Sequence, residues 1–323
     1  MKNIPTPVDN TFWETRPSIP LNFRAEWDQV KYNERPIYQD TDMISSQIDA
    51  YQYYSENNSV IHLHSHPFYE FIYCCNGNPH YLLDGMLYQL QKGDVLLIPP
   101  DVSHCPISLD CMKDPYVRNV IRIDKAFAIR LSKYVPTVLS DYASPIVLHV
   151  ESKNQDFWEK QFLFCVREFY EKKPGWQATL VGQTLQLLGF LNRSLGKDWD
   201  CMPRPEKGTL LNKILMYVEG HLTDKITLKN TARLFSVSES TIVKLFRRSL
   251  NVSFSQYVTQ RRLISAKAYL TEDKPLEQIS EALGFSDYST FYRAFRKEYG
   301  MGPLCFQKKQ KAIYHYTEEF TNE

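Results

Sequence analysis

The stretch that decides the fold runs from residue 282 to residue 303 and reads ALGFSDYSTFYRAFRKEYGMGP. We interpret it as the end of a short helix, a turn at Gly284, and a second helix with its N-cap at Ser286. Glycine leaves a helix in the left-handed conformation at the least cost, and serine is a favoured N-cap residue. This succession predicts a helix-turn-helix unit.

An earlier segment repeats the same pattern. Residues 228–238, LKNTARLFSVS, match residues 276–286, LEQISEALGFS, at an offset of 48. Residues 240–248, STIVKLFRR, match residues 289–297, STFYRAFRK, at an offset of 49. Ser236 stands in the first copy where the second has its glycine. The chain therefore contains two copies of one supersecondary unit.

The second helix of each copy is expected to have an apolar face that packs inward and a polar face. The polar faces carry hydroxyls and long cations, at Ser240, Lys244, Arg247, Ser289, Tyr292, Arg293 and Arg296. In a DNA major groove, arginine can pair bidentately with guanine and serine can bind several base edges. One such helix alone would also fit an ordinary solvated helix, but two copies in a basic segment favour DNA binding.

Charge is divided unevenly along the chain. The whole chain carries a net charge of +1, but residues 209–312 contain 17 Lys and Arg against 9 Asp and Glu, a balance of +8 that leaves −7 for the rest. A nucleic-acid-binding segment fused to an acidic partner has this asymmetry. A basic solvated face is the alternative interpretation.

Residues 282–303 resemble the signature of the AraC/XylS family of bacterial transcription regulators, and the resemblance covers about a hundred residues from Thr209 onward. The family's connecting helix is matched in the segment 254–270, at Arg262, Leu263, Ala266 and Leu270. The chain departs from the pattern after Pro303, where Phe306 is followed by glutamine and the family usually has arginine. A contact at that helix end is therefore in doubt.

The resemblance implies two recognition helices that enter adjacent major grooves on one face of DNA, about one duplex turn or roughly 34 Å apart. It implies base contacts for Glu239, Ser240, Thr241, Lys244, Tyr288, Ser289, Thr290 and Arg293. It implies phosphate contacts, which fix register and supply salt-dependent affinity, for Arg247, Arg248, Arg296 and Lys297.

Short aromatic and β-branched runs between turn signals fill residues 38–122. Asp84-Gly85 separates the runs 81–83 and 87–90, which predicts a type I′ hairpin because both central residues of that turn need positive φ. The run 95–98 ends at two prolines, which cannot donate to a strand ladder. An antiparallel barrel is the natural solution for so many short strands.

His64, His66, Glu70 and His104 form a candidate site in this barrel. Residues two apart on a strand share a face, so His64 and His66 can point inward together. The spacing resembles the two motifs of the cupin superfamily, and three imidazoles with one carboxylate can ligate iron, manganese, nickel or zinc. Regulators of the AraC type often keep these residues without metal, so we favour a small-molecule effector site without a cofactor. Satisfied core histidines and a metal site at the same four residues are the alternatives.

Trp13 and Tyr81 complete the candidate effector site. Sugars stack on aromatic rings, which makes a saccharide a candidate effector, although the same rings can equally fill a core. The resemblance also implies an N-terminal arm that can close over the ligand, and residues 12–13 could do so.

Helical spacing begins at about residue 155, breaks at 172–175 and resumes over 176–195. This helical hairpin either packs on the barrel or presents a dimer surface. The predicted fold class is α+β, a cupin-like antiparallel barrel with a helical hairpin followed by an all-α domain with two helix-turn-helix motifs. The predicted domains are an arm and effector-binding barrel (1–150), the hairpin (151–196), a linker (197–208), the DNA-binding domain (209–312) and a tail (313–323).

The sequence thus predicts an effector-controlled DNA-binding transcription regulator, an activator in the family's commonest role, and not an enzyme. A metal-dependent cupin enzyme with a DNA-binding tail is the alternative. The expected partners are double-stranded DNA, the effector, a second copy of the chain, RNA polymerase if it activates, and no membrane. Seven cysteines without zinc-finger spacing, and no apolar run near the roughly 20 residues that cross a bilayer, predict a reduced, cytoplasmic protein.

Overall fold

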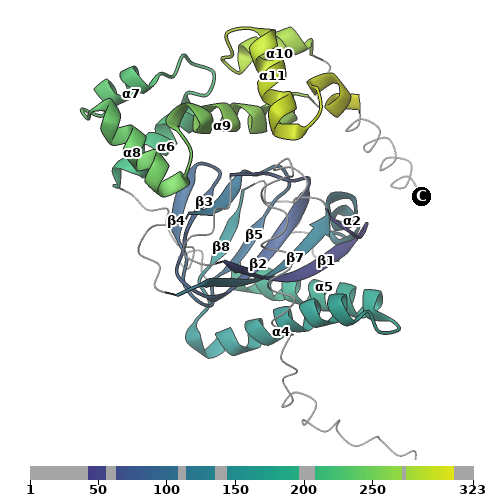
Figure 1. Ribbon diagram of the computed structural model, residues 1–323. Helices are drawn as coiled ribbons and strands as arrows, with labels where there is room; N and C mark the ends of the chain where they lie inside the picture. Colours follow the sequence, from purple (N-terminus) through teal and green to yellow (C-terminus); the bar gives the residue numbers. More distant parts are fainter. Residues whose placement is uncertain are drawn as a thin grey trace, which may run out of the picture. The chain divides into compact units, whose positions relative to one another are not determined.

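The computed structural model describes residues 43–55, 63–107, 114–134, 144–195, 208–270 and 274–308. Within them, strands occupy the first half of the chain and helices the second (Figure 1). This confirms the predicted α+β class. Trp13, the arm, residues 197–207 of the predicted linker and the tail lie outside the described residues.

The described strands form two antiparallel sheets. One has the order β1-β7-β2-β5-β8, with β1 (Ile48–Ser55), β7 (Tyr116–Asp124), β2 (Phe68–Asn76), β5 (Val95–Ile98) and β8 (Ile146–Leu148). The other has the order β4-β3-β6, with β4 (Met86–Gln89), β3 (His80–Leu83) and β6 (His104–Ile107).

The prediction of a closed barrel is wrong for the described strands. Closure requires continuous pairing around the whole sheet. The strands of the smaller sheet are only four residues long, and beyond β6 the pairing continues as a single bridge between His64 and His104. Two facing sheets bury the same apolar side chains without that closure.

The Asp84-Gly85 hairpin is confirmed. Leu83 pairs with Met86, so a two-residue turn joins β3 to β4. Both turn residues have positive φ, 46° at Asp84 and 77° at Gly85. The type I′ geometry inferred from these two residues therefore fits the observed turn.

Alternation along the strands builds two cores. Ile72 and Leu96 of the larger sheet lie in one cluster with Tyr81 and Leu83 of the smaller sheet. The opposite face of the larger sheet, with Phe71 among its residues, packs against α4 (Ser152–Glu171) and α5 (Trp176–Leu195). The helical hairpin therefore completes the core of the sheet domain.

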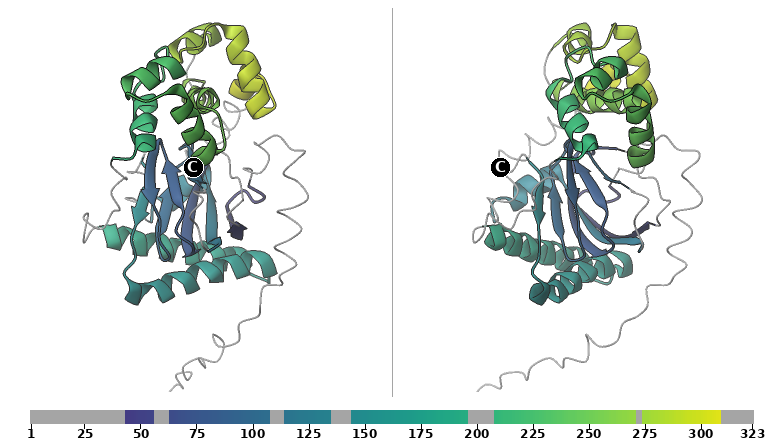
Figure 2. Two further views of the ribbon diagram at one scale, coloured as in Figure 1. Left: turned by 60° about the vertical axis from the view of Figure 1, so that its left-hand side comes forward. Right: turned by 90° about the vertical axis from the view of Figure 1, so that its left-hand side faces the viewer.

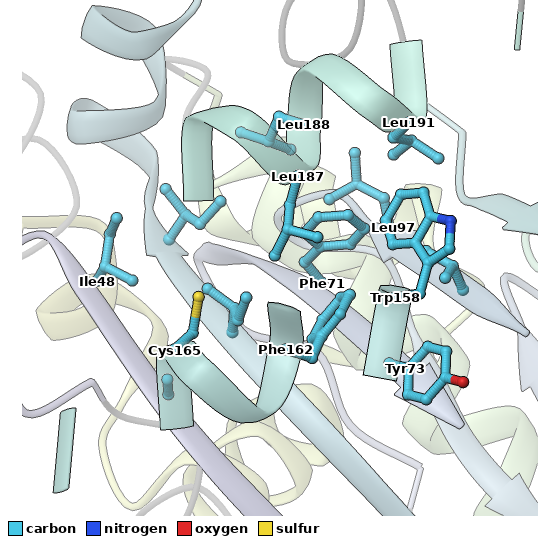
Figure 3. Close-up of a cluster of buried hydrophobic side chains, with 14 of the residues drawn as sticks. Ile48, Phe71, Tyr73, Leu97, Trp158, Phe162, Cys165, Leu187, Leu188 and Leu191 are labelled. Carbon is cyan, nitrogen blue, oxygen red and sulfur yellow. The ribbon is translucent and has the colours of Figure 1, made fainter. Parts of the chain in front are cut away.

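Figure 3 shows this second core, with Phe162 of α4 and Leu187 of α5 directed at Phe71. Both views of Figure 2 show the two teal helices lying along one face of the sheet. The break between them is confirmed, because α4 ends at Glu171 and its C-cap Lys172 adopts a left-handed conformation with φ 48°. A short helix, α2 (Lys125–Leu131), follows β7.

Six further helices follow within the described residues after 208: α6 (Leu210–Gly220), α7 (Leu228–Leu234), α8 (Glu239–Leu250), α9 (Phe254–Tyr269), α10 (Leu276–Ala282) and α11 (Tyr288–Tyr299). The pairs α7–α8 and α10–α11 are the two predicted helix-turn-helix units. Phe246 of α8 is buried with Tyr257 near the start of α9, whereas Phe291 of α11 is buried with Leu270 at its end. The connecting helix α9 thus carries one unit at each end (Figure 1).

The turns of the two units confirm the repeat and correct one cap. Ser236 has φ 54° and Gly284 has φ 71°, so the serine adopts the left-handed conformation that the glycine adopts in the second copy. Ser238 caps α8 as the repeat implies. The N-cap of α11 is Asp287 and not Ser286, and its side chain accepts from the Thr290 amide. Aspartate competes equally well with serine for this position, and here its carboxylate reaches the amide.

Phe306, the residue before the departure from the family pattern at Gln307, is buried. Its ring lies 5.4 Å from that of Phe295 and 5.7 Å from that of Tyr299. This end of the domain is therefore fixed by apolar packing. None of the described helices is both long enough and apolar enough to cross a bilayer, and the five cysteines in the described residues carry free thiols.

Candidate DNA-binding surface and effector site

Helix α8 divides into a buried and an exposed face, as its sequence predicts. Ile242 and Phe246 are fully buried. The six predicted DNA-contacting residues are all exposed: Glu239, Ser240, Thr241, Lys244, Arg247 and Arg248. The hydroxyls of Ser240 and Thr241 each lie 2.8 Å from the Ser238 hydroxyl. A hydroxyl both donates and accepts, so these groups can still bind a base edge.

Helix α11 repeats this division. Phe291 and Phe295 are fully buried. Four of the predicted DNA-contacting residues on this helix are exposed: Ser289, Arg293, Arg296 and Lys297. The other two, Tyr288 and Thr290, are half-buried. The Thr290 hydroxyl donates to the Asp287 carboxylate at 2.9 Å, so its first role is in the helix cap. Arg293 carries its guanidinium into solvent while its Nε donates to the Ser289 carbonyl at 3.3 Å.

A cluster of histidines surrounds Glu70 at the strand ends. Nδ1 of His66 lies 2.9 Å from the Phe68 carbonyl, and Nδ1 of His104 lies 3.0 Å from the Val102 carbonyl. A carbonyl only accepts, so both Nδ1 atoms carry a proton, and a neutral imidazole at either position presents a lone pair at Nε2. Neither Nε2 has a hydrogen-bond partner within the described residues, although both are fully buried.

Glu70 lies against both lone pairs. Its Oε2 is 3.5 Å from Nε2 of His66 and 3.3 Å from Nε2 of His104, while its Oε1 accepts from Nε of Arg122 at 3.1 Å. Burial lowers the pKa of His66 to about 4, against the opposing effect of Glu70, so this imidazole is neutral at pH 7. Burial opposes ionisation of Glu70, but the adjacent His66, His104 and Arg122 hold its pKa well below the usual range.

This arrangement offers several polar atoms to a bound group. Nε2 of His66, Nε2 of His104 and Oε2 of Glu70 lie close together and are buried. His64 joins them, because donor atoms of His64, His66 and His104 all lie within 4.8 Å of one another. A hydrogen-bond donor or a cation placed among them would satisfy all of these acceptors.

Of the two other predicted effector residues, Tyr81 and Trp13, the structure describes only Tyr81. Tyr81 is buried in the core between the sheets, and its ring stacks over His104 at a centroid distance of 6.4 Å. Trp13 lies outside the described residues. Tyr81 is 2% exposed, which favours the core-filling role over stacking on a sugar.

Sequence reasoning missed Arg122 and its two tyrosine neighbours. Arg122 pairs directly across the sheet with Glu70, and its guanidinium lies 5.3 Å from the Tyr51 ring and 5.7 Å from the Tyr53 ring. Both rings are half-buried. A signal was present, since an arginine in the apolar run 120–123 must either reach solvent or find a buried partner.

Two family models match the chain in the places where these two surfaces lie. The model of the AraC-like ligand binding domain matches residues 48–126, and a helix-turn-helix domain model matches residues 231–309. The chain belongs to the AraC family of transcription regulators. The histidine cluster lies in the ligand-binding domain of this AraC-family regulator, and α8 and α11 lie in its DNA-binding domain.

Two curated proteins that are similar to the chain are transcription regulators. The AraC-family chain is 37% identical over 128 residues to the probable transcriptional regulator LumQ of Photobacterium leiognathi, a match that covers 36% of the chain and 52%, about half, of LumQ. It is 25% identical over 251 residues to the transcriptional activator RhaR of Escherichia coli, which covers 74% of the chain and 84% of RhaR. The crystal structure of ToxT from Vibrio cholerae is 13% identical, with a TM-score of 0.34 over 81% of this chain and 98% of that one.

These similarities bear on the two functional alternatives. The chain's relatives are transcription regulators, and its two matched domains bind a ligand and DNA in this family. These findings support the prediction that the AraC-family chain is an effector-controlled DNA-binding regulator and not an enzyme. The interpretation as a metal-dependent cupin enzyme with a DNA-binding tail gains no support from them.

Proposed function

We propose that this regulator activates transcription by inserting α8 and α11 into adjacent major grooves, under the control of a small molecule bound at the histidine cluster. RhaR is an activator, which motivates activation and a contact with RNA polymerase. The proposed division is an arm and effector domain (1–150), a hairpin (151–196), a linker (197–208) and a DNA-binding domain (209–312), in a cytoplasmic protein.

The observation that carries the DNA-binding role is the repetition of an exposed, cationic helix face. Lys244 on α8 and Arg293 on α11 are both exposed, and both helices pack against α9. Two such faces on one connecting helix are suited to a site that spans two grooves.

Arg293→Ala and Arg296→Ala separate base recognition from phosphate binding. The full chain first selects its operator from random duplex DNA, and Kd is then measured on that operator and on a scrambled duplex. We expect Arg293→Ala to cost about 1–3 kcal/mol, roughly 5- to 150-fold in Kd, on the operator alone. Arg296→Ala should weaken both duplexes alike and lower the slope of log Kd against log salt by about one. Equal losses on both duplexes for Arg293→Ala would reject its base contact.

A neutral ligand rich in hydroxyl groups is the effector that the cluster fits best. Its O–H groups would donate to Nε2 of His66 and His104, and its oxygens would accept from Arg122. Arg122 already pairs with Glu70, so the carboxylate is engaged within the protein and the imidazole nitrogens are the groups that face a ligand. A panel of mono- and oligosaccharides tests this by thermal shift, since a ligand at a hundred times its Kd stabilises a protein by about 2.7 kcal/mol.

A divalent transition metal is the second candidate, because three imidazole donors lie within 4.8 Å of one another. We expect purified protein to hold well under one equivalent of metal, because Arg122 engages the one carboxylate that would join the imidazoles as a ligand. Metal analysis by mass spectrometry measures this directly, with and without prior dialysis against Co²⁺. A full equivalent that is lost in His64→Ala and in His104→Ala would make a metal the occupant instead.

Dimerisation is proposed for the helical hairpin. The inner faces of α4 and α5 are used in the core, so a dimer must use the outer faces, where Phe157 is 36% and Tyr170 is 50% exposed. Two copies would present two DNA-binding domains to adjacent half-sites. We expect a dimer in sedimentation at micromolar concentration and a shift toward monomer for Tyr170→Glu. A strict monomer, with DNA and without it, would contradict this assignment.

A further inference from the structure

We propose that α9 detects the occupancy of the histidine cluster through Ser65 and Ser103, which receive hydrogen bonds from Lys267 and Arg261. The inference rests on the proposed effector site and adds how that site reaches the DNA-binding domain. Each serine is a chain neighbour of a cluster histidine: Ser65 lies between His64 and His66, and Ser103 precedes His104.

Lys267 is bound to the first of these serines. Its Nζ donates to the Ser65 hydroxyl at 2.8 Å and to the Ser65 carbonyl at 3.1 Å. The side chain is only 5% exposed, although lysine is seldom buried. Burial lowers its pKa to about 8, so the ammonium is still charged at neutral pH. A buried charge of this kind is costly to leave without its acceptors, which makes the contact sensitive to small displacements of residue 65.

Arg261 is bound to the second serine. Its Nη1 donates to the Ser103 hydroxyl, and its Nη2 donates to Asp84 of the β3–β4 turn at 3.1 Å. Its Nε donates to Glu219 of α6 at 2.6 Å, and the whole side chain is 4% exposed. One guanidinium therefore joins the DNA-binding helices α6 and α9 to the strand end that leads into His104.

Ser65 and Ser103 lie on two backbone segments that a pair of hydrogen bonds joins to each other. His64 and His104 form a bridge in which each amide donates to the other's carbonyl, at 3.2 Å and 2.8 Å. Successive side chains of extended backbone point to opposite faces. The histidines therefore face the effector site while the serines between and beside them face α9. A ligand that draws the histidines together shifts the backbone that holds the acceptors of Lys267 and Arg261.

The signal reaches both recognition helices because α9 is joined firmly to each unit. Arg262, the next residue, donates to the carbonyls of Leu222, Asp224 and Gly284, at 2.9 Å, 2.5 Å and 2.7 Å. The first two lie before α7 and the third lies in the turn of the second unit. A β-carbon on Gly284 would lie 2.9 Å from the Thr223 carbonyl oxygen, so this junction has no room to adjust. Any shift of α9 therefore changes how the two units are presented together.

A double-mutant cycle on DNA affinity tests the connection without a known effector. His104→Gln perturbs the cluster, Lys267→Met removes the α9 donor, and Lys213→Met is the control, since Lys213 is an exposed lysine of α6. We expect His104→Gln to change Kd for the selected operator at least fivefold, the lower end of typical couplings, in wild type and in Lys213→Met. In Lys267→Met the same substitution should change Kd less than twofold.

Two further variants keep the result decisive. Ser65→Ala removes the hydroxyl acceptor and should also reduce the effect of His104→Gln, while Lys267→Arg retains a donor and should preserve it. Equal effects of His104→Gln in wild type and in correctly folded Lys267→Met and Ser65→Ala, or no effect in wild type, overturn the proposal. Failure of the effector site itself is separate, since it would appear as the absence of any thermal shift with the saccharide panel.

Discussion

Arg122→Met is expected to lower the free energy of unfolding by about 3–5 kcal/mol, because it leaves the Glu70 carboxylate buried without its cation. Glu70 is 5% and Arg122 is 9% exposed, so water cannot replace the lost partner. Chemical denaturation of the full chain measures the loss. Arg130→Met is the matched control, since Arg130 is exposed on α2, and its effect should stay within about 0.5 kcal/mol.

A double variant tests whether the loss of stability comes from the ion pair between Glu70 and Arg122. Glu70→Gln combined with Arg122→Met removes both charges, and it should recover a large part of the stability that Arg122→Met loses. If the double variant is as unstable as the sum of the two single variants, the loss comes from packing against Tyr51, Tyr53 and Phe68, over which the guanidinium also lies. That outcome would contradict the ion pair as the basis of the site.

Phe291→Ala is expected to cost about 3–5 kcal/mol and to disorder the second helix-turn-helix unit before the first. Phe291 is fully buried, and its ring lies 5.2 Å from Phe285 and 5.5 Å from Phe295. Hydrogen exchange should rise along α10 and α11 while α7 and α8 keep their protection. Val243→Ala on α8 is the control, because Val243 is 40% exposed and should have little effect.

The effect of Phe291→Ala on operator affinity shows whether both helix-turn-helix units bind DNA or only the first one does. If both units bind, the variant should retain only the weaker affinity of one unit and lose protection of one of two grooves. Unchanged operator affinity in a variant whose α11 has lost its exchange protection would mean that the second unit does not contact DNA.

The features that local chemistry dictates could be predicted from the sequence. Asp84-Gly85 predicted its hairpin because few residues tolerate positive φ, and the run 95–98 became β5 with the predicted bounds. The helix 176–195 and the two helix-turn-helix units followed from apolar periodicity and from the repeat. The cap of α11 was misplaced by one residue because Ser286 and Asp287 are adjacent and both are good caps.

Features that depend on long-range register could not be predicted in this way. The histidines and Glu70 could be grouped because strand parity and a motif place them together, but Arg122 joins them only through the pairing of β2 with β7, 52 residues away. The contacts of Lys267 and Arg261 with Ser65 and Ser103 span 202 and 158 residues, and no local pattern announces them. The closed barrel was wrong because strand number alone does not decide how far the pairing continues.

Footprinting of the full chain on its selected operator tests the central claim most directly. Protection of guanine N7 from methylation reports occupancy of the major groove. The account predicts two protected segments on one face of the duplex with centres about 10 base pairs, roughly 34 Å, apart, and loss of one segment in Lys244→Ala and of the other in Arg293→Ala. Protection of a single groove, or of two segments on opposite faces, would contradict it.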